Sequence, residues 1–140
     1  GMKAIGKHFP GHGGIQADTH LGFSADHRSI AQLEQHDILP FSFLSNRLGG
    51  VMTAHISFPE IDHDIPTFSK FWLQEILREK MQFKGIIFSD DLSMKGTDFL
   101  GDIITKTQKS LQPKRESELE IQSALGTFKN GNLTYFGKNQ

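Results

Sequence analysis

Three short apolar runs, each ending in titratable side chains, constrain the fold of this chain more than any other feature. The runs occupy residues 2–6, 51–58 and 86–89. The titratable residues at or near their carboxyl ends are Lys7, His8, His55, Asp90 and Asp91. Because the carboxyl ends of parallel strands meet at one edge of a sheet or barrel, polar residues there are typical of α/β active sites. The pattern therefore predicts parallel strands whose ends carry a functional site.

The segments between the apolar runs have the spacing of amphipathic helices. Residues 28–39 place apolar and polar side chains on opposite faces, and Ser29 is a suitable N-cap. A second helical stretch covers residues 40–48. A third covers residues 70–81, where Trp72 belongs to the apolar stripe and is expected in the core. Helices between successive strands imply right-handed crossovers and a parallel sheet.

The composition excludes several classes of protein. The 140 residues carry a net charge of −1, so neither a nucleic-acid-binding surface nor a membrane-binding surface is indicated. No cysteine is present, which rules out disulfides and fits the cytoplasm. No apolar run approaches the ~20 residues of a membrane span, and the N-terminus lacks the pattern of a signal peptide. We therefore expect a cytoplasmic protein with no nucleic-acid or membrane partner.

The loop after the first run, residues 7–20, is rich in glycine and in ionisable groups. Its ionisable residues are Lys7, His8, His12, Asp18 and His20. A polar, solvated turn is one interpretation of such a loop, and the active end of an α/β sheet is the other. The Phe9–Pro10 bond within this loop is a candidate for the cis form.

A metal site is an alternative interpretation of the same part of the chain. Imidazole and carboxylate ligands for zinc or manganese could come from His8, His12, His20, His55, Asp18 and Asp90. His8 and His12 have the ligand spacing of a helix, but Pro10 and Gly11 lie between them and argue against a helix there. A metal-dependent hydrolase is therefore the less favoured enzyme class.

Three motifs resemble the family 3 glycoside hydrolases. They are Lys-His-Phe-Pro-Gly-His-Gly at residues 7–13, Asp-Thr-His at 18–20 and Ser-Asp-Asp-Leu-Ser-Met at 89–94. Within that family they are similar to the bacterial β-N-acetylhexosaminidases of the NagZ type. The resemblance implies an α/β fold, a partial TIM-type (β/α) barrel with about three parallel strands and flanking helices over residues 1–100. A divergent segment, residues 101–140, is expected to add a C-terminal helix and a β-hairpin.

The resemblance implies retaining hydrolysis of a terminal β-linked N-acetylglucosamine, as in the recycling of muropeptides. Such a reaction needs a carboxylate nucleophile and a proton donor on opposite sides of the scissile bond. Chemistry alone does not order the two acids Asp90 and Asp91. The resemblance makes Asp90 the nucleophile and Asp91 a structural residue, and it makes His20, oriented by Asp18, the acid/base.

The resemblance also assigns the residues that bind the sugar. Lys7 and His8 correspond to the pair that hydrogen-bonds the sugar hydroxyls in the family. His55 faces the same end and is expected to line the pocket, while His12 is expected to shape the loop. The implied partner is an N-acetylglucosamine-containing sugar, and no cofactor or metal is implied. Surface positions are expected for His27, His36 and His63.

The barrel of the family is longer than this chain, since a TIM barrel typically needs ~250 residues. The acidic residue and the arginine with which the family grips the sugar would lie before Met2, so we expect the chain to lack them and the N-terminal barrel strands. An alternative function is a catalytically inactive barrel fragment. Its exposed sheet edges predict association into a homo-oligomer.

The sequence changes in character toward the C-terminus. Spaced apolar residues up to Leu111 indicate an amphipathic helix, and residues 113–125 form a charged, helix-like segment. Residues 127–136 predict a hairpin, because an Asn-Gly dipeptide lies between residues that favour strands. No apolar run in this region suits a further barrel strand.

Overall fold

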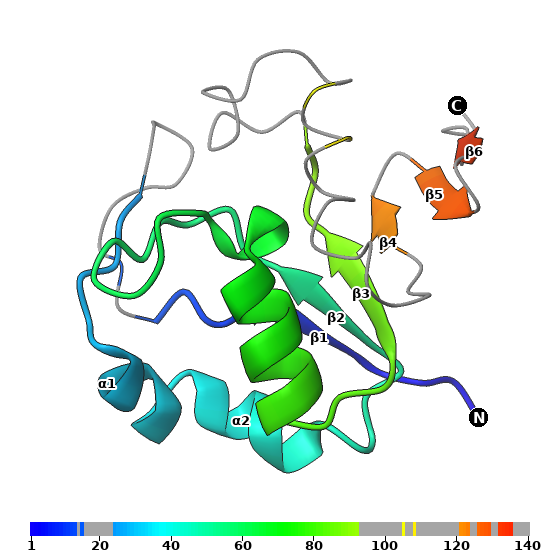
Figure 1. The fold of residues 1–140 in the computed structure, drawn as a ribbon. Helices are drawn as coiled ribbons and strands as arrows, with labels where there is room; N and C mark the ends of the chain where they lie inside the picture. Colours follow the sequence, from blue (N-terminus) through cyan, green and yellow to red (C-terminus); the bar gives the residue numbers. More distant parts are fainter. Residues whose placement is uncertain are drawn as a thin grey trace.

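The described residues of the computed structural model are 1–13, 15, 24–92, 105, 108, 121–123, 126–129 and 132–135. They include a six-stranded sheet whose strands follow the order of the sequence (Figure 1). The strands are β1 (Ile5–Phe9), β2 (Gly50–Thr53), β3 (Ile86–Ser89), β4 (Ile121–Ser123), β5 (Gly126–Lys129) and β6 (Asn132–Tyr135). The helices are α1 (Ile30–Gln35), α2 (Ile38–Leu44), the 3₁₀ helix η1 (Pro66–Phe68) and the π-helix η2 (Phe71–Lys80).

Strands β1, β2 and β3 are parallel and form the predicted centre of the fold. The register aligns Lys7 of β1 with Met52 of β2, and Val51 of β2 with Ile87 of β3. The β1–β2 register shifts between Lys7 and Phe9, at the end of β1 where the glycine-rich loop follows. The prediction of a partial (β/α) barrel with three parallel strands and flanking helices is confirmed.

Strand β4 corrects the prediction for residues 113–125. We expected a helix-like segment there and no further barrel strand, yet β4 pairs in parallel with β3, with Ile87 opposite Ile121 and Phe88 opposite Gln122. The open edge of β3 offers backbone hydrogen-bonding groups to a neighbouring strand. A three-residue strand can therefore form there without an apolar run of its own, because strand preference depends strongly on context.

The predicted C-terminal hairpin is confirmed. Strands β5 and β6 pair antiparallel, and Lys129 lies opposite Asn132 at the turn. Most of the amphipathic helix predicted up to Leu111 lies outside the described residues. The division of the chain at residue 100 stays a prediction.

The helix predicted over residues 28–39 is shorter than expected, since α1 ends at Gln35, and the second helical stretch predicted over residues 40–48 begins earlier, as α2 at Ile38. Helix α1 begins at the predicted cap, where the Ser29 Oγ accepts the backbone N–H of Gln32 at 3.3 Å and the Gln32 side chain accepts that of Ser29 at 2.9 Å. The α1 backbone leaves helical geometry at His36, which has φ −127° and ψ −83°. Helix α2 then places Pro40 in its first turn, where the missing N–H has no intrahelical role.

The helix predicted over residues 70–81 is present as η2. The Ser69 Oγ accepts the N–H of Trp72 at 3.0 Å at its start, and the Met81 N–H donates to the Ile76 carbonyl at 2.9 Å at its end. The last bond spans five residues, as in a widened helical turn. Neither η2 nor any other helix in the described ranges has the length and apolarity that a membrane crossing requires.

Trp72 lies in the centre of the core, as predicted. Its side chain is fully buried, and its ring centroid is 5.2 Å from that of Phe58 and 6.0 Å from that of Phe9. Val51 of β2 and Ile87 of β3 belong to the same cluster. The helices and the sheet therefore share one continuous core.

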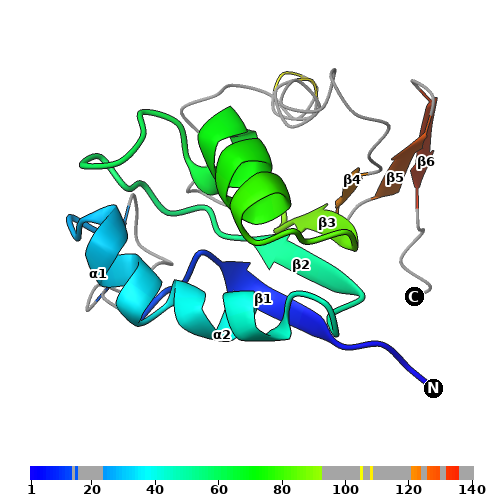
Figure 2. The same cartoon turned by 60° about the horizontal axis from the view of Figure 1, so that its bottom comes forward.

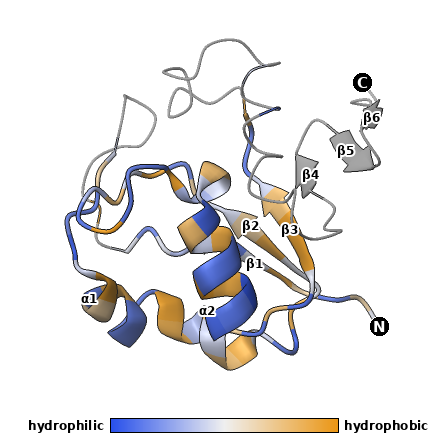
Figure 3. Ribbon diagram, viewed as in Figure 1, coloured by the Kyte–Doolittle hydropathy of each residue, from blue (hydrophilic) through white to orange (hydrophobic). Residues whose placement is uncertain are grey.

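Helices α2 and η2 pack on one face of the sheet, with α2 beside β1 and η2 over β2 and β3 (Figures 1 and 2). Gly6 allows α2 to approach β1 closely, because a Cβ there would lie 3.0 Å from Leu48 and 3.1 Å from Phe41. Strands β2 and β3 carry mainly hydrophobic residues, and hydrophilic residues cover much of the outer side of η2 (Figure 3).

The opposite face of the sheet is less covered. Ile5 is 51% exposed and Ile86 is 38% exposed, although both lie in strands. Lys7, Met52 and Phe88 share one face because they are register partners. This is the face that a complete barrel would enclose.

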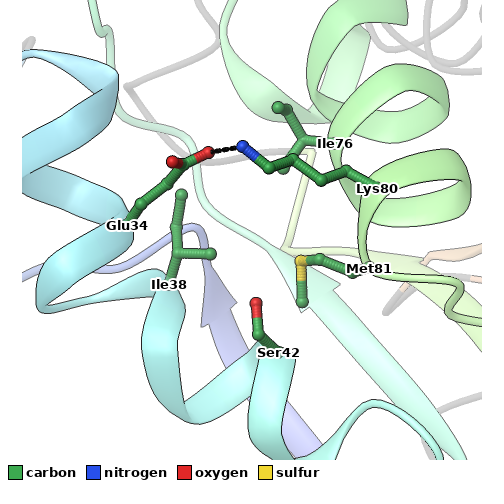
Figure 4. A pocket seen from close by; sticks show the side chains of 6 residues that line it. All are labelled: Glu34, Ile38, Ser42, Ile76, Lys80 and Met81. Atoms are coloured by element: carbon green, nitrogen blue, oxygen red, sulfur yellow. Dashed lines mark hydrogen bonds and ion pairs between the residues drawn. The ribbon is translucent and has the colours of Figure 1, made fainter.

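A hollow of about 330 Å³ lies among α1, α2 and η2 (Figure 4). Its lining residues are Glu34, Ile38, Ser42, Ile76, Lys80 and Met81. The Lys80 Nζ donates to the Glu34 Oε1 across it. None of the predicted catalytic or sugar-binding residues belongs to this lining, so the candidate site lies elsewhere.

Candidate active site

The carboxyl ends of β1 and β3 bring His8 and Asp90 together. The Nε2 of His8 lies 3.5 Å from the Oδ2 of Asp90, and the two side chains are 28% and 21% exposed. Both groups are thus partly shielded by protein while remaining within reach of a ligand. An imidazole beside a carboxylate is a pair that can bind polar ligands and handle protons.

The Asp90 carboxylate is also fixed by the backbone. Its Oδ1 accepts the N–H of Asp91 at 2.8 Å, while its Oδ2 faces His8. Asp90 therefore faces the histidine with one carboxylate oxygen and the backbone with the other.

His55 lies near the same end of the sheet, just beyond β2, and is buried. The residue is 8% exposed, and neither ring nitrogen has a hydrogen-bond partner in the part of the chain that is described. Burial lowers its pKa from 6.5 to about 4, although the charges of Asp90 and Asp91 act in the opposite direction. At neutral pH the ring is therefore uncharged and has one donor and one acceptor available for a ligand.

His12 packs against His8 from the glycine-rich loop. Their ring centroids lie 4.9 Å apart with an interplanar angle of 31°. Partial burial and the neighbouring His8 lower the pKa of His12. The loop thus contributes a second imidazole next to the His8–Asp90 pair. The Phe9–Pro10 bond of this loop is cis, as the sequence suggested, and Lys7–His8 is cis too.

Buried hydroxyl groups connect the strands beneath the site. The Thr53 Oγ1 donates to the Phe88 carbonyl at 3.2 Å and lies 2.9 Å from the Thr67 Oγ1, which donates to the Ala54 carbonyl at 3.3 Å. These hydrogen bonds link β2 to β3 and to η1. They fix the position of the backbone just before His55 and Asp90.

Lys7 lies on β1 one residue before His8, and its side chain is exposed. The register with Met52 and Phe88 places it on the less covered face of the sheet. The structure thus brings His8, His55 and Asp90 to one end of the sheet and leaves the Lys7 side chain exposed.

Sequence reasoning missed Arg28, which bridges Asp26 and Asp37 with its guanidinium group. Asp37 falls within the helix predicted over residues 28–39, yet its Oδ2 accepts the N–H of Gly13 in the site loop at 2.9 Å. Only the clustering of opposite charges beside a glycine-rich loop hints at this contact in the sequence. No periodicity pairs residues 24 positions apart.

The remaining predicted residues fall in two groups. Asp18 and His20 lie outside the described residues, so their role stays a prediction. The histidines expected at the surface are indeed exposed, with exposed side-chain fractions of 70% for His27 and 99% for His63, and His36 is exposed as well.

The metal interpretation gains no support from the described ranges. No group of three or more histidine, aspartate or glutamate side chains there is placed to hold a metal ion. His8, His12, His55 and Asp90 therefore do not form a ligand set by themselves.

Comparison with known proteins gives consistent matches. Residues 1–124 match the family described as "Glycosyl hydrolase family 3 N terminal domain". The chain is 48% identical over 112 residues to a beta-hexosaminidase of Idiomarina loihiensis, covering 80% of this chain and 34% of that protein. It is 43% identical over 138 residues to a beta-hexosaminidase of Shewanella frigidimarina, covering 97% of this chain and 40% of that protein.

A solved structure shows the same relationship. The native NagZ of Neisseria gonorrhoeae superimposes with a TM-score of 0.73 at 38% sequence identity, covering 89% of this chain and 34% of that one. The chain thus spans about a third of the length of the proteins that it matches.

Proposed function

The chain belongs to the glycosyl hydrolase family 3 N-terminal domain family, and from this membership we propose that it acts as a retaining β-N-acetylhexosaminidase. The proposed substrate is a terminal β-linked N-acetylglucosamine, as in the cytoplasmic recycling of muropeptides. The relatives named beta-hexosaminidase support this class of sugar. The single observation that carries the proposal is the 3.5 Å approach of His8 to Asp90 at the strand ends.

The proposed reaction proceeds in two steps. In the first, the Asp90 carboxylate attacks the anomeric carbon while His20 gives a proton to the departing glycosidic oxygen, which leaves a glycosyl ester on Asp90. In the second, His20 accepts a proton from water, and that water displaces Asp90 from the sugar. Asp18 orients the imidazole of His20 and stabilises its charged form.

Three further residues would hold the sugar. Lys7 and His8 donate hydrogen bonds to its hydroxyl groups, in keeping with their places at the end of β1. His55 offers an uncharged ring whose nitrogens lack partners in the described part of the protein. A ligand that satisfied those nitrogens would remove the cost of leaving them buried and unpaired.

The competing proposal is a barrel fragment without turnover. It is favoured by one observation, that the chain covers only 34% of the beta-hexosaminidase of Idiomarina loihiensis. Association of copies through the open edge of β1, where Ile5 is 51% exposed, would supply further strands. Sedimentation analysis tests this association directly, and a monomeric mass at micromolar concentration would exclude it.

The test of the enzymatic proposal is hydrolysis of 4-nitrophenyl N-acetyl-β-glucosaminide by the purified chain. Asp90→Asn is the diagnostic variant, because it keeps the shape of the side chain and removes the nucleophilic charge. Asp64→Asn is the matched control, since Asp64 has a side chain that is 60% exposed and pairs with the exposed His63. Circular dichroism of all three proteins establishes that they are folded.

Turnover that Asp90→Asn abolishes and Asp64→Asn retains would support the proposal. The corresponding 4-nitrophenyl β-glucoside should react more slowly if the N-acetyl group is recognised. A folded chain with no turnover would reject the enzymatic proposal and leave the fragment without chemistry. Equal turnover by the wild type and Asp90→Asn would reject Asp90 as the nucleophile.

A further inference from the structure

We propose that Asp37 is a positioning residue for the candidate active site. Its carboxylate fixes the turn at Gly11–Gly13 and thereby sets the imidazoles of His12 and His8 beside Asp90. The consequence for turnover rests on the proposed glycosidase function. The placement of the two imidazoles does not rest on that function and can be measured without a substrate.

Arg28 holds the Asp37 carboxylate from one side. Its Nη1 donates to the Oδ1 of Asp37 at 2.9 Å and its Nη2 to the Oδ2 at 3.0 Å. The same guanidinium donates through its Nε to the Oδ1 of Asp26 at 3.0 Å, and through its Nη2 to the Oδ2 at 2.6 Å. One planar group thus makes paired hydrogen bonds to two carboxylates, an arrangement that restricts the orientation of all three side chains.

This cluster is largely shielded from solvent and is linked to the segment that follows β2. The side chains of Asp26 and Asp37 are 1% and 11% exposed. The Arg28 guanidinium donates hydrogen bonds to both carboxylates and lowers the pKa of each, so both are charged at neutral pH. The Asp26 N–H donates to the Ser57 carbonyl at 2.9 Å, in the segment that follows β2. Asp37 is therefore a fixed point relative to the strands.

Asp37 holds the glycine-rich loop with its other side. The Oδ2 accepts the N–H of Gly13 at 2.9 Å. Gly11 has φ +141°, and a Cβ at that position would lie 2.4 Å from the Cβ of Asp37. The loop therefore turns directly over the Asp37 side chain, at a distance that only glycine permits.

His12 connects the turn held by Asp37 to the candidate active site. This residue lies between the two glycines that touch Asp37, and its ring lies 4.9 Å from the ring of His8. The Nε2 of His8 lies 3.5 Å from the Oδ2 of Asp90. A displacement of the turn would therefore move an imidazole that neighbours the proposed nucleophile.

An amide cannot replace the Asp37 carboxylate. Its Oδ1 accepts a hydrogen bond from Arg28, and its Oδ2 accepts from Arg28 and from Gly13. Asparagine has a single acceptor oxygen, so Asp37→Asn must turn an NH₂ group toward an N–H donor. The variant keeps the volume of the side chain and, in either orientation of the amide, loses one of the two Arg28 bonds that fix the carboxylate beneath the loop. When the NH₂ group takes the Oδ2 position, the Gly13 bond is lost as well.

The experiment compares Asp37→Asn with Asp62→Asn in the whole chain. Asp62 is a suitable control because its Oδ2 accepts a hydrogen bond from the Ser69 Oγ, just before η2, rather than from the loop. Proton NMR measures the nuclear Overhauser effect between the rings of His8 and His12 in each folded protein. We expect Asp37→Asn to lose this effect and Asp62→Asn to keep it.

The kinetic readout separates positioning from stability. A displaced His8 should raise KM and lower kcat, with a fall in kcat/KM of about tenfold to a hundredfold per folded molecule for Asp37→Asn. A change that only lowered stability would leave both constants unchanged once the folded fraction is taken into account. Asp62→Asn should behave in this second way.

A folded Asp37→Asn protein with a wild-type Overhauser effect would overturn the proposal. If the wild type shows no turnover, the proposed function fails, and the NMR comparison still decides whether Asp37 positions the histidines. Gly13→Ala provides a second variant if Asp37→Asn does not fold. Its Cβ would lie 3.0 Å from the Asp37 Oδ2, so it should weaken the His8–His12 effect while the Arg28 bonds persist. An unchanged effect in that variant would equally overturn the proposal.

Discussion

The Nε2 of His8 lies 3.5 Å from the Oδ2 of Asp90, although His8 lies in β1 and Asp90 directly follows β3, and these strands are not neighbours in the sheet. Strand β2 runs between them, and His55 lies just beyond its end. The contact between His8 and Asp90 therefore lies at the end of β2, the strand between β1 and β3. It depends on the relative placement of β1 and β3, which the core beneath them determines.

The buried imidazole of His55 should make the stability of the protein depend on pH. Its pKa falls from 6.5 to about 4 on folding, so between these values the unfolded chain binds more protons than the folded one. The contribution is fully present above pH 6.5 and is lost as the pH falls toward 4. At pH 5 the loss is about 2 kcal/mol. Urea unfolding at pH 7.5 and pH 5.0 measures it.

His55→Gln should remove this part of the pH dependence, whereas His63→Gln should retain it, because the His63 side chain is 99% exposed. If the wild type and His55→Gln lose the same free energy of unfolding between the two pH values, the imidazole is not buried in its neutral form.

Phe58→Ala should destabilise the fold strongly. Phe58 is fully buried, and its ring packs against that of Trp72 at 5.2 Å, so the truncation leaves a cavity. The expected loss is about 3–5 kcal/mol. Phe43→Ala removes the same atoms from a residue that is 79% exposed and should change stability by less than about 0.5 kcal/mol. Thermal unfolding measures the stability of both variants. Similar losses of stability would contradict the burial of Phe58.

Ser69→Ala should destabilise the start of η2. The Ser69 hydroxyl is buried, accepts the N–H of Trp72 at 3.0 Å and donates to the Asp62 carboxylate. Loss of a cap typically costs about 1–2 kcal/mol, and the unpaired Asp62 acceptor adds to it. Ser42→Ala is the control, since Ser42 is exposed within α2 and alanine is a better helix former there. Denaturant titration should show a loss for the first variant alone.

The ion pair between Lys80 and Glu34 should contribute little, despite its prominent position in the hollow of Figure 4. The Lys80 side chain is 59% exposed and that of Glu34 is 31% exposed, so water and salt screen the pair. A double-mutant cycle with Lys80→Met and Glu34→Gln should give a coupling energy of at most about 1 kcal/mol. Raising the salt concentration to about 1 M should reduce it further. A larger coupling energy that did not change with salt would show that water reaches this ion pair less than the exposed fractions of Lys80 and Glu34 indicate.

The parts of the fold that sequence reasoning predicted are those determined by local pattern. The apolar runs at residues 51–58 and 86–89 specify β2 and β3, whereas β1 lies at Ile5–Phe9, later than the run at residues 2–6, and is largely exposed. The stripe that contains Trp72 specifies η2 because helical spacing selects one apolar face. The strand-end placement of His8 and Asp90 follows from the parallel order of the strands.

The parts that the sequence did not reveal depend on contacts between distant residues. Strand β4 gains its hydrogen bonds from the edge of β3, so its own residues carry little strand signal. The break between α1 and α2 coincides with Asp37, whose partners are a loop glycine and an arginine nine positions before it. Such partners become neighbours only after the chain has folded.

The contact of Gly11 and Gly13 with Asp37 has a consequence for the evolution of the family. A side chain at Gly11 would collide with Asp37, and one at Gly13 would crowd its carboxylate. A lineage that changes one of these three positions must therefore compensate at another or lose the turn. We expect Gly11, Gly13 and Asp37 to covary among related sequences, so that a substitution at one position is accompanied by a substitution at another.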